Sequence, residues 1–127
     1  MEHAASMRAL SDRLFGAVIA GDIDAVRAIY APDAVIWHAH TNSTQTVEEN
    51  LRTLEMIAKY ITGFRYEDQR CEATEHGFIE QHVTCGMTPA GVEFSIPSCI
   101  VCRVVDGRVT RLDEYFDSAA AAPLLGR

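Results

Sequence analysis

The sequence lacks any apolar run that approaches the ~18 residues needed to cross a bilayer, and its first residues do not join a basic segment to a long apolar stretch. Basic residues are also few, with 11 Lys and Arg against 18 Asp and Glu and a formal net charge of −7. Because no Lys/Arg cluster offsets this charge, the surface repels phosphate backbones. We therefore expect a cytoplasmic protein that binds neither membranes nor nucleic acid.

Glycine and proline are scarce, at 8 and 4 residues, and no repeat or low-complexity segment is present. A chain of 127 residues has the size of one domain, so we expect a single domain over residues 1–127. Four cysteines occur without a secretory segment, which predicts reduced thiols. Cys99 and Cys102 lie in a strand-like run, where residues three apart face opposite sides, so their spacing does not predict a redox or zinc site.

Three segments in the first half of the chain have the apolar spacing of helices. Residues 4–20 carry an apolar stripe at three- and four-residue steps. A short second helix follows, which Asp22 caps and Pro32 ends. A third covers residues 47–61, with one of the preceding threonines as its cap and two acidic residues in its first turn.

The remaining apolar segments predict strands. The first covers residues 34–40, and the polar residues 41–44 after it predict a loop. From residue 64 the apolar period changes to two, which predicts strands linked by glycine-containing turns near residues 64–74, 78–88, 92–105 and 108–117. Helices followed by hairpins predict an α+β fold with an antiparallel sheet that curls around the helices. The third of these strands is apolar on both faces, which predicts a homodimer through the sheet.

Two histidines in the first strand are candidates for proton transfer. His38 and His40 lie two residues apart, so in a strand both face the same side. Imidazole titrates near neutrality, so His38 could accept and return a proton. It could equally be a hydrogen-bonded core histidine, with His40 at the rim. A His-x-His spacing with a nearby carboxylate could also hold zinc or iron.

Acidic residues on two later strands could face the same site. Glu114 alternates with Leu112 and Phe116 on one face of the last strand. A carboxylate among large apolar neighbours is costly to bury alone, so we expect it to pair with a histidine, for structure or for catalysis. Glu80 and His82 share a face of an earlier strand, and a one-residue slip would turn both outward.

Two stretches, GDIDAVRAIYAPDAVIWH at residues 21–38 and DGRVTRLDEYFD at residues 106–117, resemble the signature segments of the nuclear transport factor 2-like superfamily, in its SnoaL-like branch. The resemblance implies a cone formed by a strongly curved antiparallel or mixed sheet on three N-terminal helices, with a pocket at its mouth, and often a dimer. The base of ketosteroid isomerases falls at His38, although Phe15 occupies the position of their tyrosine. The final-strand aspartate of limonene epoxide hydrolases falls at Glu114.

These observations predict an enzyme that acts on a small hydrophobic organic molecule by acid–base chemistry, with no cofactor and no metal. We expect His38 as the base or acid, Glu114 as its partner and His82 as a second polar anchor. The reaction would be isomerisation, cyclisation, dehydration or hydrolysis. The predicted pocket lining comprises Phe15, Ile36, His40, Met56, Tyr60, Glu80, Phe94, Ile100, Leu112 and Phe116. The alternative is a non-catalytic domain of the same fold that binds a ligand or forms a dimeric contact.

Overall fold

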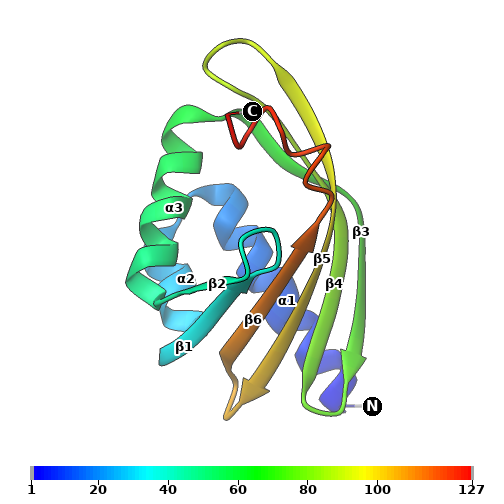
Figure 1. Cartoon of the computed structure of the whole chain (residues 1–127). Helices are drawn as coiled ribbons and strands as arrows, with labels where there is room; N and C mark the ends of the chain where they lie inside the picture. The colour runs from blue at the N-terminus through cyan, green and yellow to red at the C-terminus, as the bar shows by residue number, and fades with distance from the viewer. Residues whose placement is uncertain (1, 127) are drawn as a thin grey trace.

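The computed structural model describes residues 2–126 and has the predicted α+β order (Figure 1). Its elements are α1 (Glu2–Ala20), α2 (Ile23–Ile29), β1 (Tyr30–His38), β2 (Ser43–Gln45), α3 (Val47–Tyr60), β3 (Thr62–Thr74), β4 (Gly77–Met87), β5 (Glu93–Val105) and β6 (Arg108–Phe116). The four later strands and the turns between them lie close to the predicted positions. Within the described residues, no helix is both long enough and apolar enough to cross a membrane.

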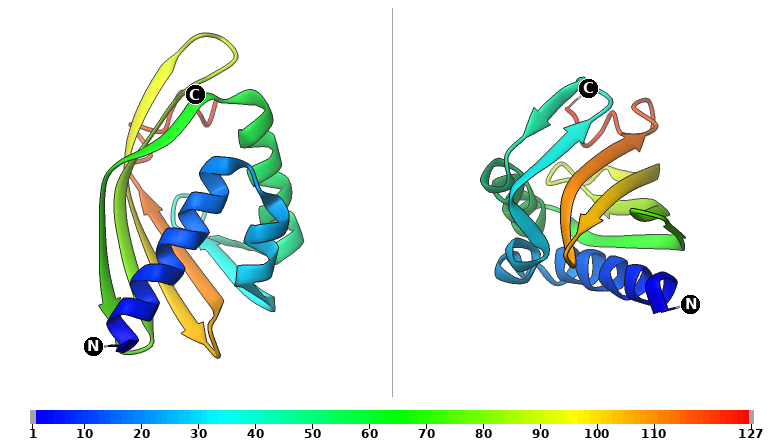
Figure 2. Two further views of the ribbon diagram at one scale, coloured as in Figure 1. Left: turned by 180° about the vertical axis from the view of Figure 1, so that it is seen from behind. Right: turned by 90° about the horizontal axis from the view of Figure 1, so that it is seen from below.

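The six strands form one curved, unclosed sheet in the order β2-β1-β6-β5-β4-β3. All three helices lie on its concave side, where α1 runs against β3 and β4 and α3 faces β1 (Figure 2). The predicted architecture of a strongly curved sheet on three N-terminal helices is therefore confirmed.

The expectation of a purely antiparallel sheet is wrong at one place. β1 pairs with β6 in parallel, whereas the other neighbouring strands pair antiparallel. Hairpins force β3 to β6 to alternate in direction, but no hairpin joins β1 to β6. The direction of β1 is set instead by the helices on either side of it in the chain.

The segment from residue 30 to residue 45 contains more strand than the sequence predicts. Ser43 and Thr44, expected to be loop, form with Gln45 the edge strand β2, which pairs antiparallel with β1. β1 begins at Tyr30 rather than at Ala34, and it contains Pro32. The pairing of β1 with β6 shifts between Tyr30 and Val35, so the missing N–H of the proline falls where the ladder is interrupted.

Local capping fixes where two helices begin. The Asp22 side chain accepts a hydrogen bond from the Ala25 backbone N–H at the start of α2, as predicted. At α3 the cap is Thr46, which forms a reciprocal capping box with Glu49. These caps set the axial position of α3, and therefore of the polar side chains that it turns toward β1.

A bulge changes which residues of β6 face the helices. Leu112 is buried and Phe116 lies on the same face, as alternation predicts. Val109, predicted to face outward, is fully buried. The register between β5 and β6 shifts between Arg103 and Val104, and this shift turns the first residues of β6 by one position.

The C-terminal segment is packed against the sheet. Ala121 is only 1% exposed and joins a second apolar cluster with Phe94 and Ile96. Leu124 and Leu125 contact the same cluster. The strands leave these apolar side chains uncovered at the open end of the cone, and the last apolar residues of the chain cover them (Figure 1).

Two glycine substitutions test this packing. A Cβ on Gly77 would overlap the backbone carbonyl of Cys102 on β5, so Gly77→Ala must separate two paired strands. We expect it to lower the free energy of unfolding by about 2–3 kcal/mol. Gly16 lies inside α1 with open space around it, so Gly16→Ala should raise that free energy by about 0.5–1 kcal/mol. Urea unfolding of both variants measures the two changes, and equal effects would contradict the packing at Gly77.

Candidate functional site

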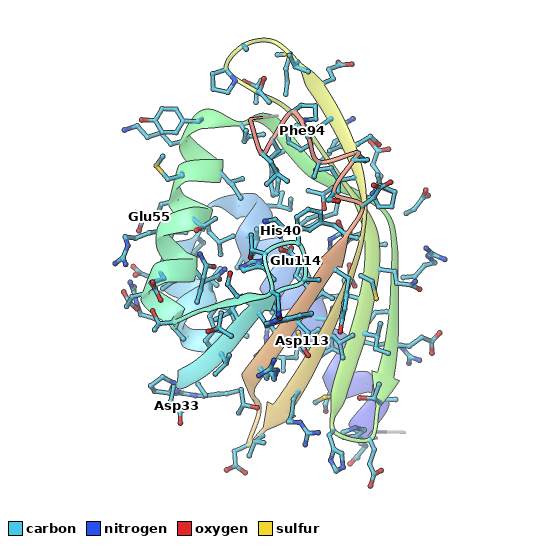
Figure 3. The ribbon with its side chains drawn as sticks, viewed as in Figure 1. Asp33, His40, Glu55, Phe94, Asp113 and Glu114 are labelled. Carbon is cyan, nitrogen blue, oxygen red and sulfur yellow. The ribbon has the colours of Figure 1, made fainter. Side chains whose placement is uncertain are left out.

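A cavity of about 600 Å³ lies between α3, the concave face of the sheet and the C-terminal segment. This volume is typical of a pocket for a small organic ligand. Its wall is mostly apolar and aromatic, and the lining that residues 2–126 contribute includes no Lys or Arg. Its histidines and its glutamate come from β1, the turn after β1, β4 and β6. Figure 3 shows Glu114 and His40 close together in the space that faces α3.

The structure brings most of the predicted site residues to this cavity. Those that border it are Phe15, His38, His40, Met56, Tyr60, His82, Ile100, Glu114 and Phe116. Met56 and Tyr60 belong to the last turns of α3 and are 57% and 46% exposed, so they form the rim. His40 packs its ring on Phe116, with 4.6 Å between ring centroids.

Four predicted lining residues do not border the cavity. Ile36 and Leu112 face inward, but they lie one step deeper along their strands and belong to the main core. Phe94 lies near the C-terminal segment, in the second apolar cluster with Ile96 and Ala121 (Figure 3). Glu80 faces inward as well, but the ring of His82 lies in front of it.

The first polar group of the cavity is a pair formed by His38 and Glu114. These residues lie directly opposite each other in the parallel ladder of β1 and β6. His38 Nδ1 is 2.9 Å from Glu114 Oε1, and the side chains are 16% and 32% exposed. The hydrogen bond to Glu114 raises the pKa of His38, burial lowers it, and a hydrogen bond to Gln45 raises it further. The pair therefore favours a charged imidazole.

Both ring nitrogens of His38 are bonded to protein groups. Nδ1 contacts Glu114, and Nε2 lies 2.9 Å from Gln45 Oε1. A base needs a nitrogen lone pair that can reach the substrate. His38 therefore borders the cavity without a free ring nitrogen, and the second oxygen of Glu114, Oε2, is the atom of this pair that can meet a ligand.

The second polar group pairs His82 with Glu80 on β4, and both side chains are 2% exposed. His82 Nδ1 is 2.9 Å from Glu80 Oε2. Glu80 also accepts hydrogen bonds from Ser11 at 3.2 Å and from Gln69 at 3.1 Å. Three donors compensate the buried carboxylate, which supports its charged form. His82 therefore carries its proton on Nδ1, and Nε2 is the nitrogen that can act in the cavity.

The ring of His82 is held between aromatic side chains. Tyr66 stacks on it with a centroid distance of 4.0 Å, and Phe15 meets it edge-on at 5.2 Å. Burial raises the pKa of Tyr66, so its hydroxyl stays protonated and can donate a hydrogen bond. Ile100 on β5 is paired with both Glu80 and Glu114, so it lies between the two polar groups.

Some site residues escape the sequence analysis. Tyr66 borders the cavity and alternates with Phe64 on β3, so the period of two could have placed it there. Gln45 lies between the predicted loop at residues 41–44 and the predicted third helix, and no pattern indicates its contact with His38. Within residues 2–126, no three or more His, Cys, Asp and Glu side chains group together in a way that could hold a metal ion.

The sequence matches the model of a family described as the SnoaL-like domain over residues 11–112. No curated protein matches the chain at a significant level of sequence similarity.

Solved structures share the fold at low identity. A nuclear transport factor 2-like protein of unknown function from Burkholderia pseudomallei is 16% identical, with a TM-score of 0.82 over 96% of this chain and 98% of that chain. PrhC from Penicillium brasilianum is 12% identical, with a TM-score of 0.82 over 98% and 88%. A protein from Catenulispora acidiphila with a ketosteroid isomerase-like fold, in complex with trimethylamine, is 14% identical, with a TM-score of 0.78 over 90% of each chain. These likenesses show the fold alone.

The His38–Glu114 pair predicts a pH-dependent contribution to stability. The folded-state pKa of His38 is raised above its unfolded value of about 6.5, so the contribution is complete below that pH and lost as the pH rises through the folded-state pKa. We expect Glu114→Gln to lower the free energy of unfolding by about 1–2 kcal/mol near pH 6 and by less near pH 9. Urea unfolding at both pH values tests this, and an equal loss at both would contradict it.

Proposed function

The chain belongs to the SnoaL-like domain family, and we propose that it is a cofactor-independent enzyme that transfers protons on a small, uncharged, mostly apolar organic molecule. One observation carries this proposal. Each of the two His–Glu pairs presents one reactive atom to the cavity: His82 presents Nε2 with Glu80 behind it, and Glu114 presents Oε2, while protein groups occupy both ring nitrogens of His38. Acid–base catalysis needs one group to accept a proton and another to donate one.

The arrangement assigns a role to each group. His82 Nε2 takes a proton from a carbon next to a carbonyl, and the negative charge moves to the carbonyl oxygen. The Tyr66 hydroxyl is suited to stabilise that oxygen by a hydrogen bond, since it is neutral and stacked on His82. Glu114 returns a proton to a second atom of the substrate: the proton shared between His38 Nδ1 and Glu114 Oε1 moves onto the carboxyl group, and rotation of that group presents it to the cavity, which leaves a carboxylate and a neutral imidazole. Solvent at the cavity mouth then resets both pairs.

The lining supports an uncharged substrate. An anionic ligand would lie near Glu114 and Glu80, and among the described lining residues there is no Lys or Arg to balance its charge. The apolar surface of Phe15, Ile100 and Phe116 favours a compact hydrocarbon body. Isomerisation, aldol-type cyclisation and dehydration of such molecules all begin with proton transfer next to a carbonyl, so the site suits this class of reaction.

Deuterium exchange tests the proposed chemistry without knowledge of the natural substrate. A panel of small apolar ketones in D2O, followed by proton NMR, reports removal of the hydrogen next to the carbonyl. We expect the protein to accelerate exchange for members that fit the cavity. His82→Gln and Glu114→Gln should each slow it about 10²- to 10⁴-fold, because each removes one proton-transfer group.

His76→Gln is the matched control, because His76 is exposed on the turn after β3, away from the cavity. This variant should catalyse ketone exchange at the wild-type rate. Circular dichroism verifies that each variant is folded. Ketones that bind while exchange stays at the buffer rate would contradict catalysis and favour the non-catalytic binding domain.

The outer face of the sheet supports a homodimer. Trp37 on β1 and Tyr115 on β6 meet edge to face there, with ring centroids 5.3 Å apart, and Tyr115 is 45% exposed. Val101 on β5 is paired with Asp113 on β6, and its side chain adds apolar surface to this outer face. A second copy of the chain would cover this surface, whereas single exposed aromatic residues need no partner.

Sedimentation measurements test the dimer. Tyr115→Glu should shift the protein to the monomer mass, because it places a charge in the apolar contact. Val92→Glu is the control, since Val92 is equally exposed but lies in the turn between β4 and β5. A wild-type protein that sediments as a monomer at high concentration would contradict the proposal.

A further inference from the structure

A chain of hydrogen bonds runs from the core to His38 through Gln45. Gln45 is the last residue of β2, and its side chain lies between β1 and α3. Its Oε1 is 2.9 Å from His38 Nε2 and accepts a hydrogen bond from Asn50 Nδ2 at 3.2 Å. Its Nε2 donates to Thr53 Oγ1 at 3.1 Å.

The buried end of this chain fixes which atom of Gln45 faces His38. The Tyr30 hydroxyl donates to Asn50 Oδ1 at 3.0 Å, and both residues are buried. The Asn50 amide must therefore turn its NH₂ group toward Gln45, and the Gln45 side chain accepts this hydrogen bond with its oxygen, Oε1.

The other end of the Gln45 side chain gives the same orientation. The Thr53 hydroxyl donates to the Glu49 carbonyl at 3.3 Å, so it accepts from the Gln45 amide nitrogen. The two constraints come from separate turns of α3, and they agree.

The protonation of His38 follows from this orientation. An amide oxygen only accepts hydrogen bonds, so His38 Nε2 must carry a hydrogen. His38 Nδ1 and Glu114 Oε1 are 2.9 Å apart, and two lone pairs at that distance would repel each other. One proton therefore lies between these two atoms, on the imidazole or on the carboxyl group.

We infer that Gln45, held by Asn50 and Tyr30, is a positioning residue that keeps His38 protonated at Nε2 and so keeps one proton between His38 and Glu114. Without Gln45, the neutral ring could place its hydrogen on Nδ1 and leave Nε2 bare. With Gln45, the proton that can leave is the one beside Glu114. The use of that proton in catalysis rests on the proposed function, whereas the protonation itself does not.

Nitrogen-15 NMR of the imidazole rings in the full, ligand-free chain tests the inference, because the shift of each ring nitrogen shows whether it carries a hydrogen. As the pH rises, His38 Nε2 should keep its hydrogen while the signal of Nδ1 changes. The titratable groups that contact His38 or its partners include Glu114 on β6, His40 beyond β1 and Tyr30 at the start of β1. Neutral Asn50 and Thr53 come from α3.

Variants separate positioning from general support. In Gln45→Leu, the nitrogen that loses its hydrogen at high pH should switch from Nδ1 to Nε2. In Gln45→Glu, the carboxylate again accepts from both neighbours, so Nε2 should keep its hydrogen as in the wild type. Gln81→Leu is the matched control, because Gln81 is exposed on β4 and should leave the His38 signals unchanged.

Two results would overturn the inference: a wild-type His38 whose Nε2 lacks a hydrogen at neutral pH, or a Gln45→Leu variant that titrates like the wild type. If Gln45→Leu does not fold, the spectra of the wild type and of Gln45→Glu still show whether His38 Nε2 carries a hydrogen. Because no substrate is present, these results stay separate from the exchange experiment. Absence of turnover with the expected His38 signals would reject the enzyme and leave the role of Gln45 intact.

Discussion

The parallel register between β1 and β6 is the constraint on which the site depends. It sets His38 opposite Glu114 and Trp37 opposite Asp113. Because side chains alternate across a strand, a slip of β1 by one residue would turn His38 outward and leave Glu114 without its partner. The fully buried Ile36, two residues before His38 on the same face, holds this register, since a slip would expose it to water.

The two His–Glu pairs offset the desolvation cost of a carboxylate in an apolar wall in different ways. Glu80 is deeply buried and receives hydrogen bonds from three side chains on α1, β3 and β4. Glu114 stays partly open and shares its charge with one imidazole. The first arrangement fixes a negative charge in place and orients a ring. The second leaves an oxygen accessible, so the two carboxylates have different chemical roles although their partners are alike.

Much of the fold follows from periodicity, because alternation and helical spacing are local properties. They placed His38, Glu114 and His82 on the inner face, and the glycine-containing turns located the hairpins. The parallel contact of β1 with β6 could not be predicted in this way, because it joins segments more than 70 residues apart. Gln45 was missed for a related reason: an edge strand of three residues gains its structure from β1 and not from its own sequence. The bulge near Val104 likewise hid the burial of Val109.

The cavity is bounded by the sheet on one side and by the C-terminal segment on another, and the two differ in how strongly they are held in place. The strands behind it are tied by continuous ladders, whereas Ala121, Leu124 and Leu125 are held by a few short turns and by apolar contact. A substitution at Ala121, Leu124 or Leu125 therefore reshapes the cavity at a lower cost in folding free energy than a substitution of the same size in the strands. The C-terminal segment is thus the part of the wall at which ligand preference can change while the sheet stays the same.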